Sequence, residues 1–562
     1  MKTLLYGGKV VNVFTGEIEQ TNVLIEDSKI IGVGEYSPED ADCVEEVTGK
    51  YVCPGFIDGH IHIESTMLTP YELTRLCLRH GTTAIVADPH EIANVSGTDG
   101  IRYMIEASRG LPMHVYIGLP SCVPATPFDE SGAVLTAEDI RPLYEESSVV
   151  GLAEMMNYPG VIYDDADVHR KISDAIERGR NVDGHAPFLS GRELDKYVAA
   201  GITSDHECSE TAEAIEKIRK GQWVMIRQGT AARNLETLLP LFDPPYNHRC
   251  LLVTDDRHPA DIMADGHIDN IIRLAVQLGK PAVTAIRMAT IQAAQCFGLR
   301  FVGAVAPGYR ADLLVLDDLD RVEVKDVYSC GKKVVADGTT LPFGKPEVSE
   351  ELSRKVLDSF KVKELTEADF ILEPRSPKCR VIEVIPGQLI TNELVCDIDW
   401  NSNNGIDTDR DILKLAVVER HNNTGHIGLG FIKGIGIKNG AIASSVSHDS
   451  HNIIVIGSDT RDMVLAANHI RSCGGNVVVS EGRVLSQMAL PIAGLMTDRS
   501  GEEIAEANEQ VREAVYRLGV SREIEPFMNM AFVSLPVIPA LKMTTQGLVD
   551  VTRFERVPLY ID

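Results

Sequence analysis

Positive charge is scarce in this sequence. The 562 residues contain 54 Lys and Arg against 82 Asp and Glu, which gives a formal net charge of −28 at pH 7. A surface this acidic repels phosphate backbones, so the composition argues against nucleic acid as a partner. The same repulsion disfavours binding to an anionic membrane.

Long apolar runs and paired cysteines are also missing. No stretch reaches the roughly 18 apolar residues of a transmembrane helix. The first residues, MKTLLYGGKVVNV, lack the sustained apolar region of a signal peptide. The 11 cysteines are scattered and form no Cys-x-x-Cys pair, which excludes a zinc ribbon and disfavours a disulfide framework. We therefore expect a cytoplasmic protein.

Three common ligand-binding motifs are incomplete. The segment GLGFIKGIG (428–436) lacks Gly-x-Gly-x-x-Gly, so a dinucleotide site is not expected. The GKP at 344–346 lacks the Ser or Thr of a P-loop. His62-Ile63-Glu64 matches the His-x-Glu of the zinc nucleobase deaminases, but their Pro-Cys-x-x-Cys is absent, so any base deamination here would use another fold.

The middle of the chain, about 55–300, alternates short apolar segments with helix-length segments. Eight such repeats predict an α/β fold of the (β/α)₈ (TIM) barrel type, because buried parallel strands are apolar on both faces. The eight predicted strands are 55–62, 82–90, 114–120, 149–156, 181–187, 201–207, 223–229 and 251–256.

The segments on either side of the predicted barrel have a different sequence pattern. Residues 1–54 and 301–344 are rich in short Val/Ile/Leu runs broken by Gly and Asp, which predicts one small β-sandwich domain made from both flanks. A polar stretch, 345–380, is expected to be a helical connector. Residues 381–562 mix strands and helices and predict a separate C-terminal α+β domain.

Polar residues stand at the C-terminal ends of most predicted barrel strands, where such barrels carry their active sites. His60 and His62 point to the same side of a strand because they are two residues apart. Each taken alone has an ordinary structural explanation, but four histidines converging on one rim indicate metal. The residues at these strand ends are His60, His62, His90, Glu154, His185, His206 and Asp255.

Two carboxylates complete this set. Glu154 and Asp255 stand in apolar strands, where a carboxylate is costly unless it is paired or bound to a cation. Glu154 could bridge two cations, and Asp255 could both touch a metal and accept a proton from water. Asp256 is turned to the other side by strand alternation. Imidazole and carboxylate ligands without thiolate suit Zn, Mn or Fe(II).

At this point the sequence resembles the amidohydrolase superfamily. The resemblance rests on PGFIDGHIH, the Glu on the fourth strand, single histidines on the fifth and sixth, TD on the eighth, and the downstream GYRADLLVLD. It covers about residues 1–340 and implies a catalytic role for Asp255. Many members have a carboxylated Lys where this chain has Glu154, which argues against hydantoinase-like relatives. The implied metal ligands are His60, His62, Glu154, His185, His206 and Asp255.

Further segments are similar to the bacterial and archaeal adenine deaminase family. They are GHIHIESTML, VADPHEIANV, SDHE, VTDDRHPADI and, beyond the barrel, GFIKGIGIKNGAIASSVSHDSHNIIVIG. This resemblance runs the whole length of the chain. It implies hydrolytic deamination of adenine to hypoxanthine in purine salvage, a binuclear divalent metal centre of Mn²⁺ or Fe²⁺ with Zn²⁺ as an option, and a homodimer. Adenine and water are the implied substrates.

A second acid is needed to protonate ring N1 of the purine. Glu207, beside His206, and Glu91, beside His90, are the candidates, although either could be a salt-bridged carboxylate at the barrel rim. The Ser-His-Asp-Ser-His-Asn segment at 447–452 predicts a turn, because its histidines are three residues apart. It could cap the purine pocket or simply bond its own backbone. Low-ranked candidates for substrate contact are His90, His448, Asp449 and His451; Glu419, His421 and His426 give a weaker signal.

Two alternatives to adenine deamination remain at this stage. One is a related amidohydrolase that acts on another aminopurine or cyclic amidine. The other is a non-catalytic barrel that serves as a scaffold, which predicts missing ligands, and none of the expected ligands is missing.

Overall fold

The computed structural model describes residues 1–230, 232–401 and 403–561, which divide into two compact units. The first unit is Met1–Pro89, Met104–Ser121 and Thr136–Glu347. The second is His90–Tyr103, Cys122–Leu135 and Val348–Asp562, so two segments from the first third of the chain group with its last third. Within the described ranges, no helix combines the length and the apolar character needed to cross a membrane.

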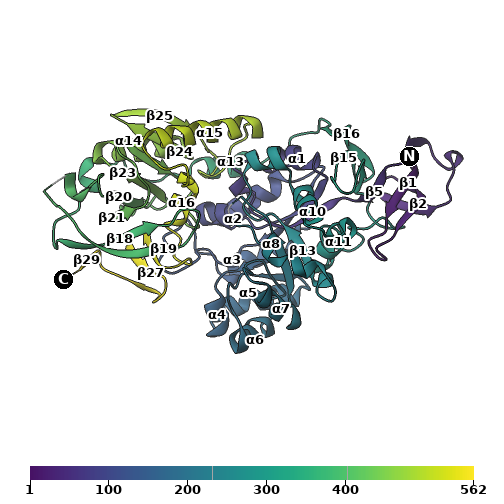
Figure 1. Ribbon diagram of the computed structural model, residues 1–562, viewed down its shortest axis with the longest axis horizontal. Helices are drawn as coiled ribbons and strands as arrows, with labels where there is room; N and C mark the ends of the chain where they lie inside the picture. Colours follow the sequence, from purple (N-terminus) through teal and green to yellow (C-terminus); the bar gives the residue numbers. More distant parts are fainter. Residues whose placement is uncertain (231, 402, 562) are drawn as a thin grey trace. The chain divides into compact units, whose positions relative to one another are not determined.

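Eight parallel strands lie in the first unit, one for each predicted strand. Figure 1 shows helices around one of them, β13 (Cys250–Val253). Five strands pair in the order β10-β9-β8-β7-β6, and three pair in the order β11-β12-β13. A parallel bridge between Ile61 and Asp255 joins β6 to the chain after β13, and the Thr203 amide donates to the Val182 carbonyl at 2.9 Å beside β10. The strands are β6 (Phe56–Ile61), β7 (Thr82–Ala87), β8 (His114–Leu119), β9 (Val149–Met155), β10 (Asn181–Gly184), β11 (Ser204–Asp205), β12 (Trp223–Arg227) and β13 (Cys250–Val253).

Helices follow these strands, as the alternating sequence pattern predicts. Strands β6, β7 and β9 are buried along their whole length, which explains why they read as continuous apolar runs. Asp165 begins α5 by accepting hydrogen bonds from the amides of Asp167 and Val168. The helices are α1 (Pro70–Leu78), α2 (His90–Ala107), α3 (Ala137–Ile140), α4 (Tyr158–Ile162), α5 (Ala166–Glu177), α6 (Gly191–Ala199), α7 (Thr211–Arg219), α8 (Leu235–Leu238), α9 (Pro259–Asp265), α10 (Ile268–Gln277), α11 (Ala282–Met288) and α12 (Ile291–Cys296).

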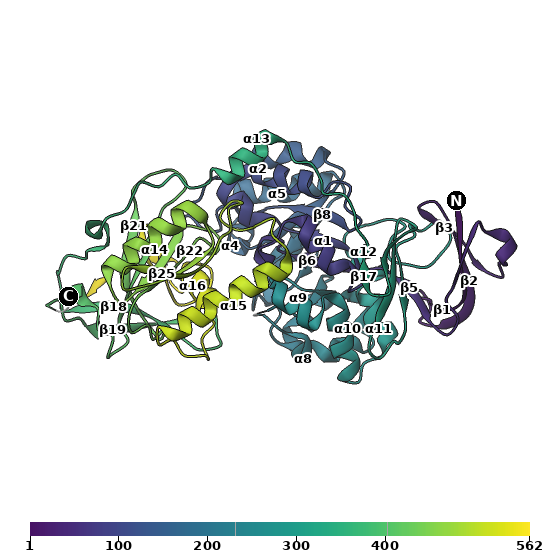
Figure 2. The same ribbon diagram turned by 90° about the horizontal axis from the view of Figure 1, so that it is seen from above.

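A second sheet of the first unit combines strands from both flanks of the barrel sequence (Figure 2). Its order is β17-β16-β15-β14-β5-β1-β2-β3, with β4 paired to β1. The junction is the antiparallel pairing of β14 with β5, in which Leu313 lies opposite Pro54. The strands are β1 (Lys2–Val11), β2 (Ile18–Glu26), β3 (Lys29–Gly34), β4 (Cys43–Glu46), β5 (Tyr51–Pro54), β14 (Leu313–Leu316), β15 (Val324–Ser329), β16 (Lys332–Ala336) and β17 (Thr339–Thr340).

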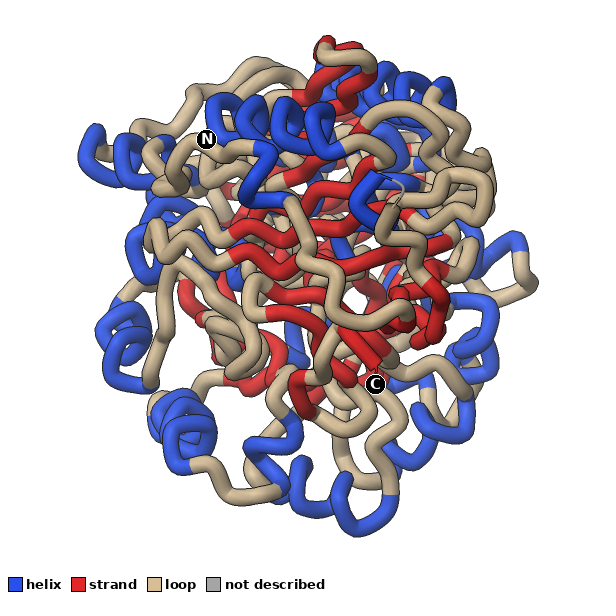
Figure 3. Tube along the Cα trace, turned by 90° about the vertical axis from the view of Figure 1, so that its left-hand side faces the viewer, coloured by secondary structure: helices blue, strands red, loops and turns tan. Residues whose placement is uncertain are grey.

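The second unit is built on a mixed sheet whose strands lie side by side (Figure 3). The order is β19-β18-β21-β20-β23-β22-β24-β25, with β29 paired to β18. Helix α14 packs its Met463, Ala466 and Ile470 against buried residues of β20, β22, β23 and β24. The elements are α13 (Glu350–Leu357), β18 (Lys378–Val384), β19 (Thr391–Asp397), β20 (Leu413–Val418), β21 (Ile427–Lys433), β22 (Ala441–Ser444), β23 (Ile453–Gly457), α14 (Thr460–Cys473), β24 (Asn476–Ser480), β25 (Arg483–Met488), α15 (Gly501–Arg517), α16 (Pro526–Phe532), β26 (Leu541–Thr544), β27 (Gly547–Asp550), β28 (Glu555–Arg556) and β29 (Tyr560–Ile561).

The polar stretch 345–380 is helical only in part. Helix α13 covers Glu350–Leu357 and a single 3₁₀ turn covers Glu367–Phe370, while β18 already begins at Lys378. Leu352 and Val356 are the buried residues of α13. Leu365 and Phe370 of the same stretch are also buried, but they pack into the core without forming an α-helix.

Residues 122–135 are tied to the C-terminal part of the second unit by side-chain hydrogen bonds. Glu130 Oε1 accepts from His426 Nδ1 at 2.7 Å, and the Glu130 carbonyl accepts from Asn452 Nδ2 at 2.7 Å. Asn422 Nδ2 donates to the Ser131 carbonyl at 3.1 Å. These bonds join residues that are between 291 and 322 positions apart in the chain.

Candidate metal centre

His60 and His62 stand at the end of β6, where the fully buried strand places both imidazoles on one side. The Nδ1 atom of His60 is 3.1 Å from Asp183 Oδ2, and the Nδ1 atom of His62 is 3.1 Å from the carbonyl oxygen of Asp88. Both partners are acceptors, so each Nδ1 carries a proton and each Nε2 keeps its lone pair.

The two Nε2 atoms lie only 3.2 Å apart. Two lone pairs that face each other at this distance repel, and a cation between them removes the repulsion. Histidine ligands of metals usually donate their second nitrogen to a carboxylate or a carbonyl, which is the arrangement of His60 and His62. The donor set therefore fits a divalent cation.

Glu154 lies between two pairs of histidines. It is buried on β9, and its Oε1 is 3.3 Å from His62 Nε2 and 4.0 Å from His60 Nε2. Its Oε2 is 2.6 Å from His185 Nδ1 and 3.2 Å from His206 Nε2. His185 and His206 directly follow β10 and β11. One carboxylate thus offers each of its oxygens to a different pair of imidazoles, as a ligand shared by two cations would.

Asp255 closes this group of side chains. Its amide donates to the His60 carbonyl at 2.9 Å, and its Oδ1 is 3.2 Å from His62 Nε2. Its Oδ2 accepts from Arg227 Nη1 at 2.6 Å. The neighbouring Asp256 is bonded instead to Ser65 Oγ at 2.6 Å.

Glu207 belongs to the same group through Arg227. Its Oε1 is 3.4 Å from His206 Nε2 and 3.7 Å from His185 Nδ1. Arg227 binds both Glu207 oxygens, at 2.5 Å from Nη1 and 3.1 Å from Nη2. Because β11 ends at Asp205, the alternation of side chains along a strand does not turn Glu207 away from His206.

The electrostatics of the group favour ionised carboxylates. Burial raises the pKa of Glu154, but the positive charge of His185 and hydrogen bonds from the histidines outweigh burial and hold that pKa well below its ordinary value. Burial likewise raises the pKa of Asp255, and Arg227 with His62 lowers it well below the usual range. Six residues bring potential ligand atoms to this group, and the histidines among them bind a cation in their neutral form: His60, His62, Glu154, His185, His206 and Asp255.

Two residues of this region were missed from the sequence, although the signal was there. Arg227 is the last residue of β12, and a polar residue at the end of a predicted barrel strand is what singled out the other candidates. Asp183 precedes His185 by two residues, the same spacing that singled out His60 and His62. Asp183 also accepts from Gly184 N at 2.8 Å and from Ser204 Oγ at 2.6 Å.

The remaining predicted site residues, His90, Glu91, His448, Asp449 and His451, belong to the second unit. Glu91 Oε2 is 3.4 Å from His451 Nε2, and His90 Nε2 is 3.8 Å from Asp449 Oδ1. Potential ligand atoms of Glu91, His448 and His451 all lie within 4.8 Å of one another. Residues 448–450 form a turn, as the three-residue spacing of the histidines predicts.

Comparisons with known proteins agree with the sequence resemblance. Residues 51–338 match the amidohydrolase family, and residues 388–555 match the adenine deaminase C-terminal domain. An adenine deaminase of Desulfatibacillum aliphaticivorans is 45% identical over 99% of this chain and 97% of its own length. Adenine deaminase 2 of Carboxydothermus hydrogenoformans is 46% identical over 99% of this chain and 96% of its own length. With identities this high over nearly the whole of both chains, this protein belongs to the adenine deaminase family of amidohydrolases.

Proposed function

We propose that this protein hydrolyses adenine to hypoxanthine and ammonia, a step of purine salvage. The observation that carries the proposal is the buried group around Glu154, in which one carboxylate offers an oxygen to each of two histidine pairs. Relatives that match this chain over nearly their whole length are named adenine deaminase, and this name is the basis for proposing adenine as the substrate. No expected ligand is missing, which speaks against a non-catalytic scaffold.

We propose that the group holds two divalent cations, Mn²⁺ or Fe²⁺, with Zn²⁺ as the alternative. Imidazole nitrogens and carboxylate oxygens without thiolate suit all three ions. When bound, such a cation lowers the pKa of a water molecule toward about 7 and so supplies a nucleophile at neutral pH. The proposed ligands are His60, His62, Glu154, His185, His206 and Asp255.

The carboxylates beside Arg227 are assigned the proton transfers. Arg227 occupies Oδ2 of Asp255, which leaves Oδ1 facing His62 and able to accept a proton from the attacking water. Water oxygen bonds to C6 of the purine, the C6–N bond breaks, and the amine leaves as ammonia with the proton that Asp255 accepted. Glu207, fixed by the same Arg227, is assigned the proton exchange with ring N1, and Glu91 is the alternative acid.

The proposal also covers the domain architecture, the oligomeric state, the cellular location and the purine contacts of the protein. The eight strands β6–β13 are proposed to close into a (β/α)₈ barrel, with residues 1–54 and 301–344 as a composite β domain, 345–380 as a connector and 381–562 as a C-terminal α+β domain. The protein is proposed to be a cytoplasmic homodimer that binds neither nucleic acid nor membranes. His90, His448, Asp449 and His451 are proposed to contact the purine.

The test is substrate-resolved ammonia release. Purified protein loaded with Mn²⁺ is incubated with adenine, guanine, isoguanine and adenosine, and ammonia is measured with a coupled assay. We expect turnover of adenine in clear preference to the other three. Preferred turnover of a different aminopurine would favour the related amidohydrolase activity, and no turnover of any of them by metal-loaded protein would refute the proposal.

A further inference from the structure

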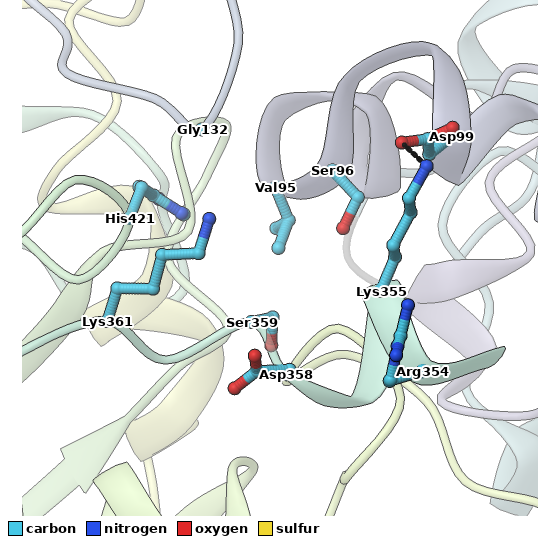
Figure 4. Close-up of a pocket in the computed structure, with 10 residues that line it drawn as sticks. All are labelled: Val95, Ser96, Asp99, Gly132, Arg354, Lys355, Asp358, Ser359, Lys361 and His421. Carbon is cyan, nitrogen blue, oxygen red and sulfur yellow. Dashed lines mark ion pairs between the residues drawn. The ribbon is translucent and has the colours of Figure 1, made fainter. Parts of the chain in front are cut away.

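The second unit contains a cavity of about 550 Å³ that the proposed chemistry does not use (Figure 4). It lies between the first turns of α2, the C-terminal end of α13 and the segment that follows α13. Its volume falls within the range of about 300–1,000 Å³ that is typical of small-molecule sites. The residues that matter for its chemistry are Arg354, Lys355, Asp358, Ser359, Lys361 and His421.

The cavity carries a positive excess in a protein of net charge −28. Lys355 is neutralised by Asp99 at 2.9 Å. Arg354 and Lys361 are exposed and, among the described residues, have no carboxylate within ion-pair distance. Asp358 is exposed and is the one further acidic side chain of the described lining. With Asp358 counted against Arg354 and Lys361, the described lining has one excess positive charge, which favours an anionic ligand.

A buried guanidinium lies behind the lining. Arg420 is fully buried and donates to Ser359 Oγ at 3.3 Å and to the Ala493 carbonyl at 2.8 Å. In the described part of the chain no carboxylate forms an ion pair with it, and burial lowers its pKa to about 9. The nearest acid in sequence, Glu419, accepts from the amides of His421, Asn422 and Thr424 instead. The charge of Glu419 offsets only part of the cost of burying this cation, and an anion at Ser359 would lower the remainder.

His421 adds a hydrogen-bond acceptor to the cavity. Its side chain is buried, and its Nε2 donates to the Ser450 carbonyl at 2.7 Å. That bond leaves Nδ1 with a lone pair, and Nδ1 has no hydrogen-bond partner among the described residues. Figure 4 shows a His421 ring nitrogen and the Lys361 ammonium directed toward the same side of the cavity. The site thus presents cations and one acceptor that needs an O–H or N–H donor.

We propose that this cavity binds the phosphate group of a small phosphomonoester. A phosphate bearing one proton combines anionic oxygens for Lys361, Arg354 and the Ser359 hydroxyl with an O–H that donates to His421 Nδ1. Sulfate has a similar shape and charge but no O–H at neutral pH, so the His421 acceptor selects against it. The cavity is much larger than a free phosphate ion, which leaves room for the organic part of a monoester.

The test is isothermal titration calorimetry of the metal-loaded full chain with inorganic phosphate, sulfate and ribose 5-phosphate. We expect phosphate to bind about tenfold more tightly than sulfate, because one hydrogen bond is lost with sulfate. At pH 6, where about half of a phosphomonoester keeps its O–H, ribose 5-phosphate should bind more tightly than inorganic phosphate. Tighter binding of inorganic phosphate would overturn the assignment to a monoester.

Two variants locate the binding. Lys361→Gln and Arg354→Gln should each weaken phosphate binding about tenfold, whereas Lys363→Gln, two residues from Lys361 and outside the cavity lining, should not. Asp358→Asn should strengthen binding, because it removes the exposed carboxylate. All four variants should keep the wild-type adenine turnover. Equal affinity for phosphate in wild type and in Lys361→Gln/Arg354→Gln, equal affinity for phosphate and sulfate, or binding that simply competes with adenine would each overturn the proposal.

Discussion

The Asp183→Asn variant tests whether the hydrogen bond between His60 and Asp183 sets the His60 tautomer that binds a metal. In the wild type, Oδ1 of Asp183 accepts from the Gly184 amide and the Ser204 hydroxyl, while Oδ2 faces His60 Nδ1 at 3.1 Å. In the variant, the Gly184 amide and the Ser204 hydroxyl keep the oxygen of the new side-chain amide at the position of Oδ1. The amide nitrogen must then take the place of Oδ2 and present an N–H to His60.

This change forces the wrong tautomer on His60. Its Nδ1 must become an acceptor, so the proton moves to Nε2, the atom that lies 3.2 Å from His62 Nε2. A protonated Nε2 does not bind a cation. Loss of such an orienting partner typically lowers metal affinity about 10–100-fold, equivalent to about 1.4–2.8 kcal/mol, and the reversed hydrogen bond places our expectation at the upper end.

The measurement is a Mn²⁺ titration of the metal-free protein followed by electron paramagnetic resonance, together with ammonia release at each Mn²⁺ concentration. Asp183→Asn should require about 100-fold more Mn²⁺ for half-occupancy of the weakened site, and its activity should rise with added metal. The exposed Asp195→Asn serves as the control for removal of one negative charge. Wild-type Mn²⁺ affinity in Asp183→Asn would refute the tautomer argument.

Three further predictions follow from the same structure. Asp255→Asn and His60→Ala should each abolish ammonia release while circular dichroism stays unchanged, and full activity in either would refute the site assignment. Arg227→Met leaves the buried Asp255 and the partly exposed Glu207 without their cation and should lower the free energy of unfolding of the metal-free protein by about 3–5 kcal/mol in chemical denaturation, with partial recovery in Arg227→Lys. Burial lowers the pKa of Lys542 to about 7, so between pH 7 and 10 the unfolded chain binds a proton that the folded chain lacks. Relative to Lys542→Met, wild-type stability should therefore rise with pH by up to about 1.4 kcal/mol per unit; a difference that does not change with pH would contradict this.

The parallel strands of the first unit were predictable from the sequence because burial leaves a local signature. Strands buried on both faces must be apolar throughout, and β6, β7 and β9 satisfy this along their whole length. Polar residues at the ends of these apolar strands could be identified in the sequence for the same reason. His60 and Glu154 were therefore found as exceptions to an apolar pattern.

Contacts between distant segments were not predictable in this way. Arg227 bonds to Asp255 and Glu207, and His60 bonds to Asp183, which lies 123 residues away. No periodicity in one segment specifies its partner in another. The burial of Arg420 was likewise not predictable, because a guanidinium in ERHNNTGH looks like an ordinary surface charge until its burial is known.

Because residues 90–103 and 122–135 belong to the second unit, a single cut in the gene cannot separate the two units. A single cut near residue 348 would produce a C-terminal fragment that lacks Glu130, the partner of His426, Asn452 and Thr545. It would also leave the N-terminal fragment with two segments deprived of the residues they pack against. The last third of the protein is therefore not a portable module, and a chimaera with a relative must exchange three stretches of sequence together to preserve it.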